Sequence, residues 1–188
     1  MITVSGELDT RFRSAAAEEG LLDVAYDVVE SPLGELFVGV SERGLCVISY
    51  QAEPDLQVER LARDFGSRVL RSPRPVDAAR RQLDEYFDGK RQRFDLDVDL
   101  RLARDFGRTV LEELGRVPFG EVTTYGTLAA RAGKPRAARA VGTIMNRNPV
   151  PIVLPCHRVV GANGSLVGYA GGIERKQQLL RLEGALLA

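Results

Sequence analysis

Turn-forming residues divide the stretch 102–146 into short helical pieces, and this feature restricts the fold more than any other. Val117-Pro118-Phe119-Gly120 ends a helical pattern over 102–116. Gly133-Lys134-Pro135 then separates two further short patterns, 123–130 and 136–146. Two short helices joined by a tight glycine-containing turn predict a helix-turn-helix.

Local residues support the ends of these two helices. Thr123 or Thr124 can cap the first helix with its side-chain oxygen. Pro135 can open the second, because a proline at the first helical position loses no hydrogen bond. A last helix is expected from Ile173 to Leu187, which would carry Glu183.

The first half of the chain shows β patterns. Runs 24–29, 35–40 and 45–50 are rich in β-forming residues and are joined by tight polar turns, which predicts an antiparallel meander. Helical spacing follows at 55–66 and 76–88. Residues 94–98 alternate and predict one more strand. The expected fold class is therefore α/β (α+β): a small N-terminal antiparallel-sheet domain with helices, then a mostly helical C-terminal domain with the helix-turn-helix and a cysteine loop. The expected division is an N-terminal extension at 1–22, loose or with one short helix, and domains at 23–100 and 101–188.

Charge is distributed unevenly between the two halves. Residues 1–100 hold 13 basic and 20 acidic side chains, whereas residues 101–188 hold 13 basic and 6 acidic ones. The stretch 114–160 has seven basic residues against Glu121 alone. This asymmetry is consistent with a polyanion meeting the second half, although attraction between the halves would also explain it.

Several classes are disfavoured. No run of about 18 apolar residues is present, so we expect no contact with a membrane, and the N-terminus lacks a signal-peptide pattern, so we expect a cytoplasmic protein. Cys46, Cys156 and His157 do not have the spacing of a zinc site, and no metal or cofactor is expected. Cys46 lies in a predicted strand, where a small buried hydrophobe is its expected role.

The segment Asn148-Pro149-Val150-Pro151-Ile152-Val153-Leu154-Pro155-Cys156-His157-Arg158 is the chemically informative one. A thiolate is a strong nucleophile at carbon, but an ordinary thiol is only a few per cent ionised at neutral pH. His157 is the only histidine that could take the proton. In an extended segment Cys156 and His157 would point to opposite faces, so a bridging water is the more plausible proton path. Glu183 is the candidate acid that would orient the imidazole.

This segment resembles the O6-alkylguanine-DNA alkyltransferases, whose acceptor cysteine lies in a Pro-Cys-His-Arg motif. The resemblance extends from about Val117 to Gly184, including Leu182-Glu183-Gly184. It implies irreversible, stoichiometric transfer of an alkyl group from O6-alkylguanine to Cys156, with O4-alkylthymine as a second candidate substrate. The implied relay is cysteine, water, His157 and Glu183, with Asn148 bracing the active-site turn and no cofactor.

The resemblance also implies how double-stranded DNA is read. A base must leave the stack before its O6 can reach a deep cysteine. The helix that follows Pro135 would lie in the minor groove, where Arg139 would fill the gap left by the base and Tyr125 would help to rotate the nucleotide and donate to guanine N3. Small residues on that helix would let the backbone approach DNA; they are Ala137, Ala138, Ala140 and Gly142. We expect a monomer, with cooperative binding along DNA left open.

The base pocket is implied by the same resemblance. Its expected members lie on the second helix of the pair, on the cysteine loop and on the glycine-rich segment after it: Met145, Pro151, Val159, Tyr169 and Ala170. The chain departs from many relatives at Gly107 and Leu111, where glutamine and tryptophan are common, which implies altered packing only.

Two other functions remain open at this point. A DNA-binding or regulatory helix-turn-helix protein without chemistry would explain the charge and the helices equally well. A cysteine hydrolase would use Cys156 as an acyl acceptor, but the adjacent Cys-His order and the lack of an oxyanion arrangement argue against it.

Overall fold

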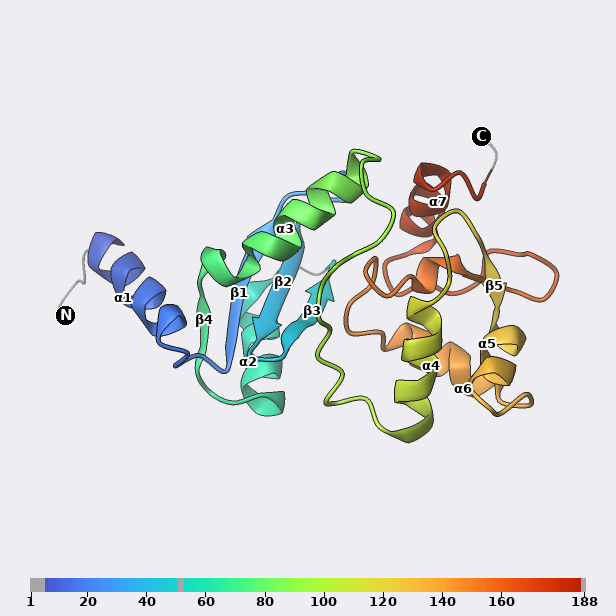
Figure 1. Cartoon of the computed structure of the whole chain (residues 1–188), viewed down its shortest axis with the longest axis horizontal. Helices are drawn as coiled ribbons and strands as arrows, with labels where there is room; N and C mark the ends of the chain where they lie inside the picture. Colours follow the sequence, from blue (N-terminus) through green and yellow to red (C-terminus); the bar gives the residue numbers. More distant parts are fainter. Residues whose placement is uncertain (1–5, 51–52, 187–188) are drawn as a thin grey trace. The chain divides into compact units, whose positions relative to one another are not determined.

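The computed structural model describes residues 6–50 and 53–186. It divides into two compact units, one made of the chain up to residue 85 together with 95–99, the other of 86–94 and the chain from 100 onward. Residues 86–94 thus belong with the second unit, whereas residues 95–99, which follow them in the sequence, belong with the first. Figure 1 labels the helices and strands along the chain. Each unit is described by itself below.

The first unit is built on a four-stranded sheet with the order β3-β2-β1-β4. The strands β1 (Val24–Val29), β2 (Leu36–Ser41) and β3 (Gly44–Ser49) form the expected antiparallel meander. The sheet is nevertheless mixed, because β4 (Val69–Arg71) pairs with β1 in parallel. The prediction of a purely antiparallel sheet was wrong in this respect: the helix between β3 and β4 returns the chain in the parallel direction, and three residues are too few to show alternation.

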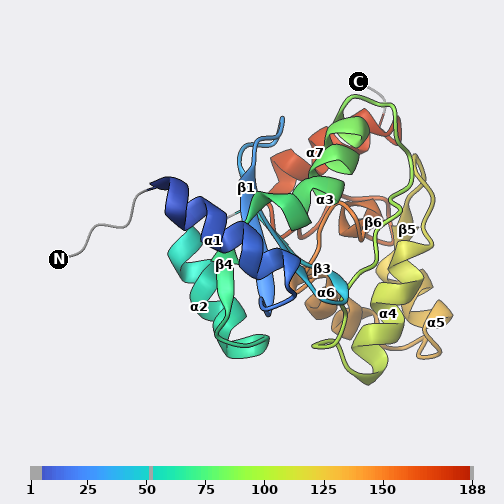
Figure 2. The same ribbon diagram turned by 60° about the vertical axis from the view of Figure 1, so that its left-hand side comes forward.

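The helices of the first unit are α1 (Gly6–Glu18), α2 (Pro54–Asp64) and α3 (Pro73–Phe87), whose last residues enter the second unit. Figure 2 shows α3 lying across the strands. Leu61 of α2 packs into a buried cluster with Val24, Phe37, Cys46 and Val69 of the sheet. Cys46 therefore lies in a hydrophobic core, where its Sγ donates to the carbonyl of Gly39. The predicted N-terminal helix exists, at thirteen residues.

The expected strand at 94–98 is absent from the structure. Only Val98 forms an isolated bridge with Leu45, whose amide donates to Asp97 at 2.8 Å. The approach of this segment requires glycine at position 44, because a Cβ there would lie 2.3 Å from the Asp97 oxygen. The alternating pattern of 94–98 thus reflects one paired residue and not a full strand.

The second unit contains α4 (Asp105–Gly115), α5 (Tyr125–Arg131), α6 (Ala138–Asn146) and α7 (Ile173–Leu182). The helix-turn-helix is formed by α5 and α6. Thr124 caps α5, since its Oγ1 accepts from the Thr127 amide at 3.1 Å. Pro135 does not open α6 as expected, because Ala137 closes a turn onto the Lys134 carbonyl and the helix begins only at Ala138.

The predicted ends of two other helices were wrong. Helix α4 begins three residues later than the pattern suggested, after Arg104 as its N-cap. Helix α7 ends at Leu182, so Glu183 is its C-cap residue and does not lie within the helix. Leu187, the expected end of that helix, lies outside the described residues. Within the described ranges, no helix is long and apolar enough to cross a membrane.

Candidate active site

A short parallel pair of strands brings the helix-turn-helix next to the cysteine segment. Strand β5 (Thr123–Thr124) pairs with β6 (Val159–Val160), with Thr123 opposite Val159. Since α5 follows β5 directly and Cys156 lies three residues before Val159, the pairing fixes the start of α5 close to the thiol. Residues Cys156–Arg158 form one turn of 3-10 helix, closed by a bond from the Arg158 amide to the Pro155 carbonyl. The extended conformation assumed from the sequence was therefore wrong.

The turn before Cys156 is held by Asn148. Its Nδ2 donates to the Leu154 carbonyl at 2.8 Å, and its Oδ1 accepts from the Val150 amide at 3.2 Å. Between these two contacts Ile152 is fully buried with a φ of 76°, a region that a β-branched residue rarely occupies. The side chain of Asn148 thus spans a strained turn whose end is the cysteine.

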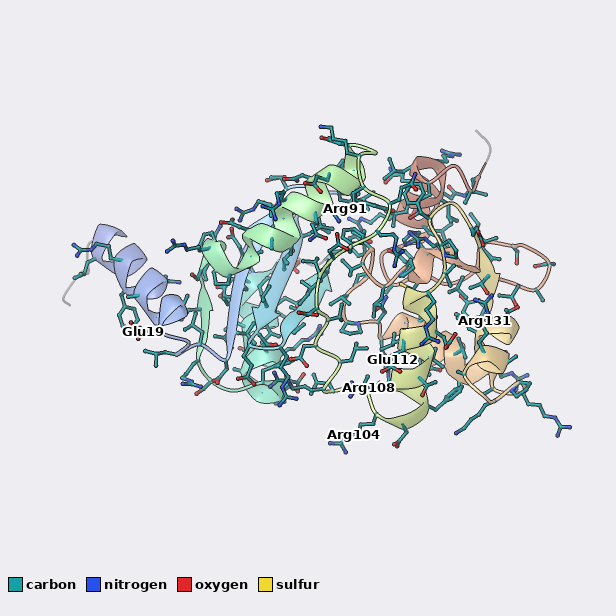
Figure 3. The ribbon with its side chains drawn as sticks, viewed as in Figure 1. Glu19, Arg91, Arg104, Arg108, Glu112 and Arg131 are labelled. Carbon is teal, nitrogen blue, oxygen red and sulfur yellow. The ribbon has the colours of Figure 1, made fainter. Side chains whose placement is uncertain are left out.

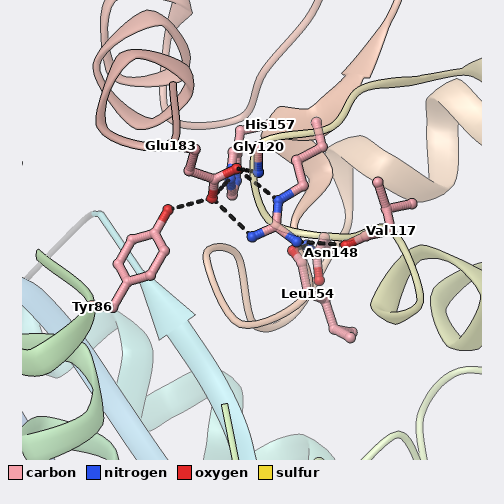
Figure 4. Close-up of polar contacts among 8 residues, drawn as sticks. Tyr86, Val117, Gly120, Asn148, Leu154, His157 and Glu183 are labelled. Atoms are coloured by element: carbon pink, nitrogen blue, oxygen red, sulfur yellow. Dashed lines mark hydrogen bonds and ion pairs between the residues drawn. The ribbon is translucent and has the colours of Figure 1, made fainter. Parts of the chain in front are cut away.

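Glu183 accepts hydrogen bonds from several parts of the second unit (Figure 4). Its Oε1 accepts from His157 Nε2 at 2.8 Å and from Arg158 Nη2 at 2.8 Å. Its Oε2 accepts from Arg158 Nε at 2.8 Å and, more weakly, from the Gly120 amide at 3.5 Å. The hydroxyl of Tyr86 donates to Oε1 as well, at 2.6 Å. The carboxylate is thus fully buried but well satisfied.

These partners determine the charge states. Burial by itself would raise the pKa of Glu183, but the hydrogen bonds from His157 and Arg158 outweigh burial and lower the pKa to about 2. Burial also lowers the pKa of His157, an effect that Glu183 only partly opposes. A neutral imidazole that donates from Nε2 to a carboxylate has its free lone pair on Nδ1. Among the described residues, that buried Nδ1 has no hydrogen-bond partner, so it is available as a base.

Cys156 is a protonated thiol in this environment. The residue is 3% exposed, and its burial raises the pKa of the thiol to about 11, against smaller lowering effects from the Asn148 side chain and the charge of Lys176. A thiol of this pKa is a poor nucleophile until a base removes its proton. The site therefore combines a protonated thiol, which is a poor nucleophile, with a neutral histidine at the next position in the sequence.

Tyr125 and Lys176 meet at one carbonyl of the glycine-rich loop. The Tyr125 hydroxyl donates to the Val167 oxygen at 3.0 Å, and Lys176 Nζ donates to the same oxygen at 3.0 Å and to the Val159 oxygen at 2.5 Å. Burial lowers the pKa of Lys176 to about 8 and raises the pKa of Tyr125; ionisation of Cys156 would raise both pKa values. Tyr125 thus lies close to the Cys156 thiol, but its hydroxyl is hydrogen-bonded to the Val167 carbonyl of the loop.

The residues expected to meet DNA differ in their exposure to solvent. Arg139 and Ala140 are exposed on α6, while Ala137, Ala138 and Gly142 are half-buried. Gly142 faces Tyr125, since a Cβ there would lie 3.9 Å from its ring. A surface hollow lies at the turn between α5 and α6, lined by Lys134, Pro135, Arg136 and Ala137.

The expected pocket residues fall into two groups. Met145, Pro151 and Val159 are buried, whereas Tyr169 is half-buried and Ala170 is exposed on the loop after β6. Among the hydrogen bonds described above, only those of Lys176 connect Val159 to that loop. The structure therefore brings Val159 close to Cys156 and leaves the loop residues at the surface.

The basic residues of 114–160 do not all contribute to one exposed positive surface. Arg158 is 5% exposed and is paired with Glu183, so it contributes nothing to an exposed positive face. Arg116 is exposed but is paired with Glu113. Figure 3 shows Arg131 on α5, and it also shows Arg108 on α4, where this residue pairs with Glu112. Counting charge along the sequence thus overstated what faces a polyanion.

Three residues of the site were not identified from the sequence: Arg158, Lys176 and Tyr86. Arg158 was visible in the Pro-Cys-His-Arg motif, and a lysine on the mostly apolar face of the last helix was an available signal for Lys176. Tyr86 lies 97 positions before Glu183, and nothing local marks it. Within the described residues, no group of three or more His, Cys, Asp or Glu side chains could hold a metal ion.

Comparison with known proteins identifies similar chains over both units. Residues 24–100 match the family model of the ribonuclease-like domain of 6-O-methylguanine DNA methyltransferase, and residues 105–185 match that of its DNA binding domain. The methylated-DNA–protein-cysteine methyltransferase of Methanosarcina barkeri is 40% identical over 158 residues, covering 84% of this chain and 96% of that protein. The crystal structure of Mycobacterium tuberculosis O6-methylguanine methyltransferase has a TM-score of 0.73 at 38% identity, covering 86% of this chain and 93% of that chain. The M. tuberculosis OGT structure in complex with DNA has a TM-score of 0.75 at 37% identity, with the same coverage.

Proposed function

The chain belongs to the O6-methylguanine DNA methyltransferase family, and we propose that it repairs DNA by moving a methyl or larger alkyl group from O6 of guanine onto Cys156. One observation carries the assignment of Cys156. The thiol is followed directly by a neutral histidine whose Nε2 is bound to buried Glu183 and whose Nδ1 is unpartnered among the described residues.

The proposed chemistry is a displacement at the alkyl carbon. The proton on Cys156 Sγ passes through a water to Nδ1 of His157, and the imidazolium is stabilised by Glu183. The thiolate forms a carbon–sulfur bond as the carbon–O6 bond breaks, and guanine leaves with the bonding electrons. Guanine leaves as an anion, whose charge is stabilised by a hydrogen bond from Tyr125 to N3. It takes up a proton from water, and the His157 imidazolium returns its proton to water.

The same step makes the protein a single-turnover reagent. The product is a thioether, which has no proton to lose and no good leaving group at neutral pH. Neither His157 nor Glu183 can regenerate the thiol, so one chain repairs one lesion. The raised pKa of Cys156 fits a single-turnover protein, because a thiol that stays protonated is protected from chance alkylation before a damaged base arrives.

Delivery of the base requires the nucleotide to leave the duplex. Helix α6 offers small residues and the exposed Arg139 for a narrow groove, which supports binding in the minor groove with Arg139 filling the vacated stack. Tyr125 would exchange the Val167 carbonyl for the base as the nucleotide enters. Each chain would act on its lesion as a monomer.

Transfer stoichiometry tests this function directly. Protein is titrated with duplex DNA that carries radiolabelled O6-methylguanine, and label bound to protein is counted. We expect saturation at one methyl group per chain for the wild type and for Cys46→Ala. We expect no transfer by Cys156→Ala, which should still bind the duplex. Repeated turnover, or transfer by Cys156→Ala, would overturn the proposal; binding without any transfer by the wild type would favour a non-catalytic DNA-binding protein.

A further inference from the structure

Tyr86 is a buried residue that reaches Glu183 from a distant part of the sequence. Its hydroxyl donates to Glu183 Oε1 at 2.6 Å, a shorter distance than those of the other hydrogen bonds to that carboxylate described above (Figure 4). The residue has no exposure to solvent. A buried tyrosine hydroxyl needs a partner, but a bond to an ionised carboxylate is stronger than most others that it could make.

The ring of Tyr86 is fixed by three aromatic neighbours. Phe87 and Phe94 lie with ring centroids 5.3 Å away, and Phe119 lies 6.1 Å away with its ring nearly perpendicular. Phe119 also lies under the Arg158 guanidinium, at 5.8 Å. Because the ring cannot turn away without disturbing these contacts, the hydroxyl is aimed permanently at the carboxylate.

The Tyr86 hydroxyl shares its acceptor atom with His157. Oε1 accepts from Tyr86, from His157 Nε2 and from Arg158 Nη2, whereas Oε2 accepts only the Arg158 and Gly120 donors described above. Each donor to Oε1 draws electron density from the atom that faces the imidazole, which makes that atom a weaker base. The phenol does this without adding a charge, unlike Arg158.

We propose that Tyr86 is a positioning residue for alkyl transfer, which fixes the Glu183 carboxylate and limits its attraction for the His157 proton, so that His157 stays neutral with Nδ1 free until the thiol proton arrives. The inference rests on the function proposed above. The relay consists of Cys156, His157 and Glu183. The new element is that Tyr86, which lies outside this relay, keeps His157 neutral in the resting protein.

The single histidine of the chain makes the proposal directly measurable. In nitrogen NMR of imidazole-labelled protein, every histidine signal comes from His157. The wild type should show the Nε2–H tautomer and a depressed titration midpoint. In Tyr86→Phe the carboxylate loses one donor and attracts the imidazolium more strongly, so the midpoint should rise by up to about one pH unit.

Kinetics supply the second readout. A rise of the His157 midpoint by up to about one unit should slow single-turnover methyl transfer at pH 7 by up to about threefold, because less of the imidazole is then neutral. The acid limb of the pH–rate profile should move to higher pH by the same amount as the NMR midpoint. A merely structural role would lower the rate without moving either midpoint.

Phe94→Leu is the matched control, because it removes one of the three aromatic neighbours of Tyr86 while Phe87 and Phe119 still hold the ring and its hydroxyl in place. We expect it to lower stability and to leave the His157 midpoint unchanged. An unchanged midpoint in Tyr86→Phe, or an equal rise in Phe94→Leu, would refute the proposal. If the wild type transferred no methyl group, the function would fail instead, and the NMR comparison would still decide the role of Tyr86.

Discussion

Arg158 and Glu183 form a bidentate ion pair in the interior of the second unit, with Nε 2.8 Å from Oε2 and Nη2 2.8 Å from Oε1. A third guanidinium nitrogen, Nη1, donates to the Val117 carbonyl at 2.6 Å. The arginine next to His157 therefore connects Glu183 to the chain just after α4. This geometry suits arginine and not lysine, because only a planar guanidinium can satisfy both carboxylate oxygens at once.

Arg158→Met should be strongly destabilising. It leaves the Glu183 charge buried with too few donors, and breaking such a pair from one side costs about 3–5 kcal/mol. Urea unfolding followed by circular dichroism measures the change. Arg116→Met is the control, since Arg116 pairs with Glu113 at the exposed surface and should change stability little. Equal losses of stability in the two variants would mean that the buried ion pair stabilises the fold no more than the exposed pair does.

Stability should fall in acid through Glu183. The pKa of this group is lowered from 4.5 to about 2 in the folded state. Between these values the unfolded chain binds the proton and the folded chain does not, so the stabilisation is complete above pH 4.5 and is lost as the pH falls toward 2. Its size is of the order of 3 kcal/mol.

Glu183→Gln tests this pH dependence. The amide has no charge to titrate, so the variant should be less stable at neutral pH and should lose less stability between pH 4.5 and 2. Thermal unfolding at a series of pH values gives both curves. Parallel curves for the variant and the wild type would assign the acid sensitivity to other carboxylates.

The free protein should hold Cys156 as an unreactive thiol. Its pKa is raised to about 11 by burial, two units above the ordinary value. Below pH 9 its reaction with iodoacetamide should therefore be at least about a hundredfold slower than in urea-unfolded protein. Mass spectrometry of the Cys156 peptide gives the rate at each pH. A half-maximal rate at or below pH 7 would show a resting thiolate and would remove the need for His157 as a base.

Arg139→Ala should separate base rotation from chemistry. Loss of the side chain should slow repair of O6-methylguanine in duplex DNA by about tenfold or more, because nothing then occupies the vacated stack. Reaction with the free base should not change. Arg147→Ala removes the same charge from the C-cap of α6 and is the control for general attraction to DNA. Equal slowing on duplex and free base, or equal effects of the two variants, would contradict the role of Arg139.

Local patterns predicted most of the secondary structure, whereas the reactive segment was proposed from a family resemblance. The meander, the two helices flanking β4 and the Thr124 cap follow from side-chain alternation, helical spacing and capping chemistry. The parallel strand β4 could not be predicted, since three residues carry no usable period. The 3-10 turn at Cys156 was missed because alternation of faces was assumed for a segment that Pro155 bends.

The relay itself shows the limit of sequence reasoning. Glu183 was paired with His157 because the imidazole needs an acidic partner, and a family resemblance gave the same pairing; the structure places the two side chains 2.8 Å apart. Tyr86 and Lys176 were missed because their contacts depend on how distant segments pack. Charge counting placed Arg158 with the DNA-facing residues, since the sequence does not show which way a side chain points.

Peptide mapping of the alkylated product tests the central claim most directly. The protein is incubated with duplex DNA carrying O6-methylguanine, digested, and sequenced by tandem mass spectrometry. One methyl group should be found on Cys156 and none on Cys46, His157 or Lys176. A methyl group on any of those three, or an unmodified Cys156 after the lesion has disappeared from the DNA, would contradict the account.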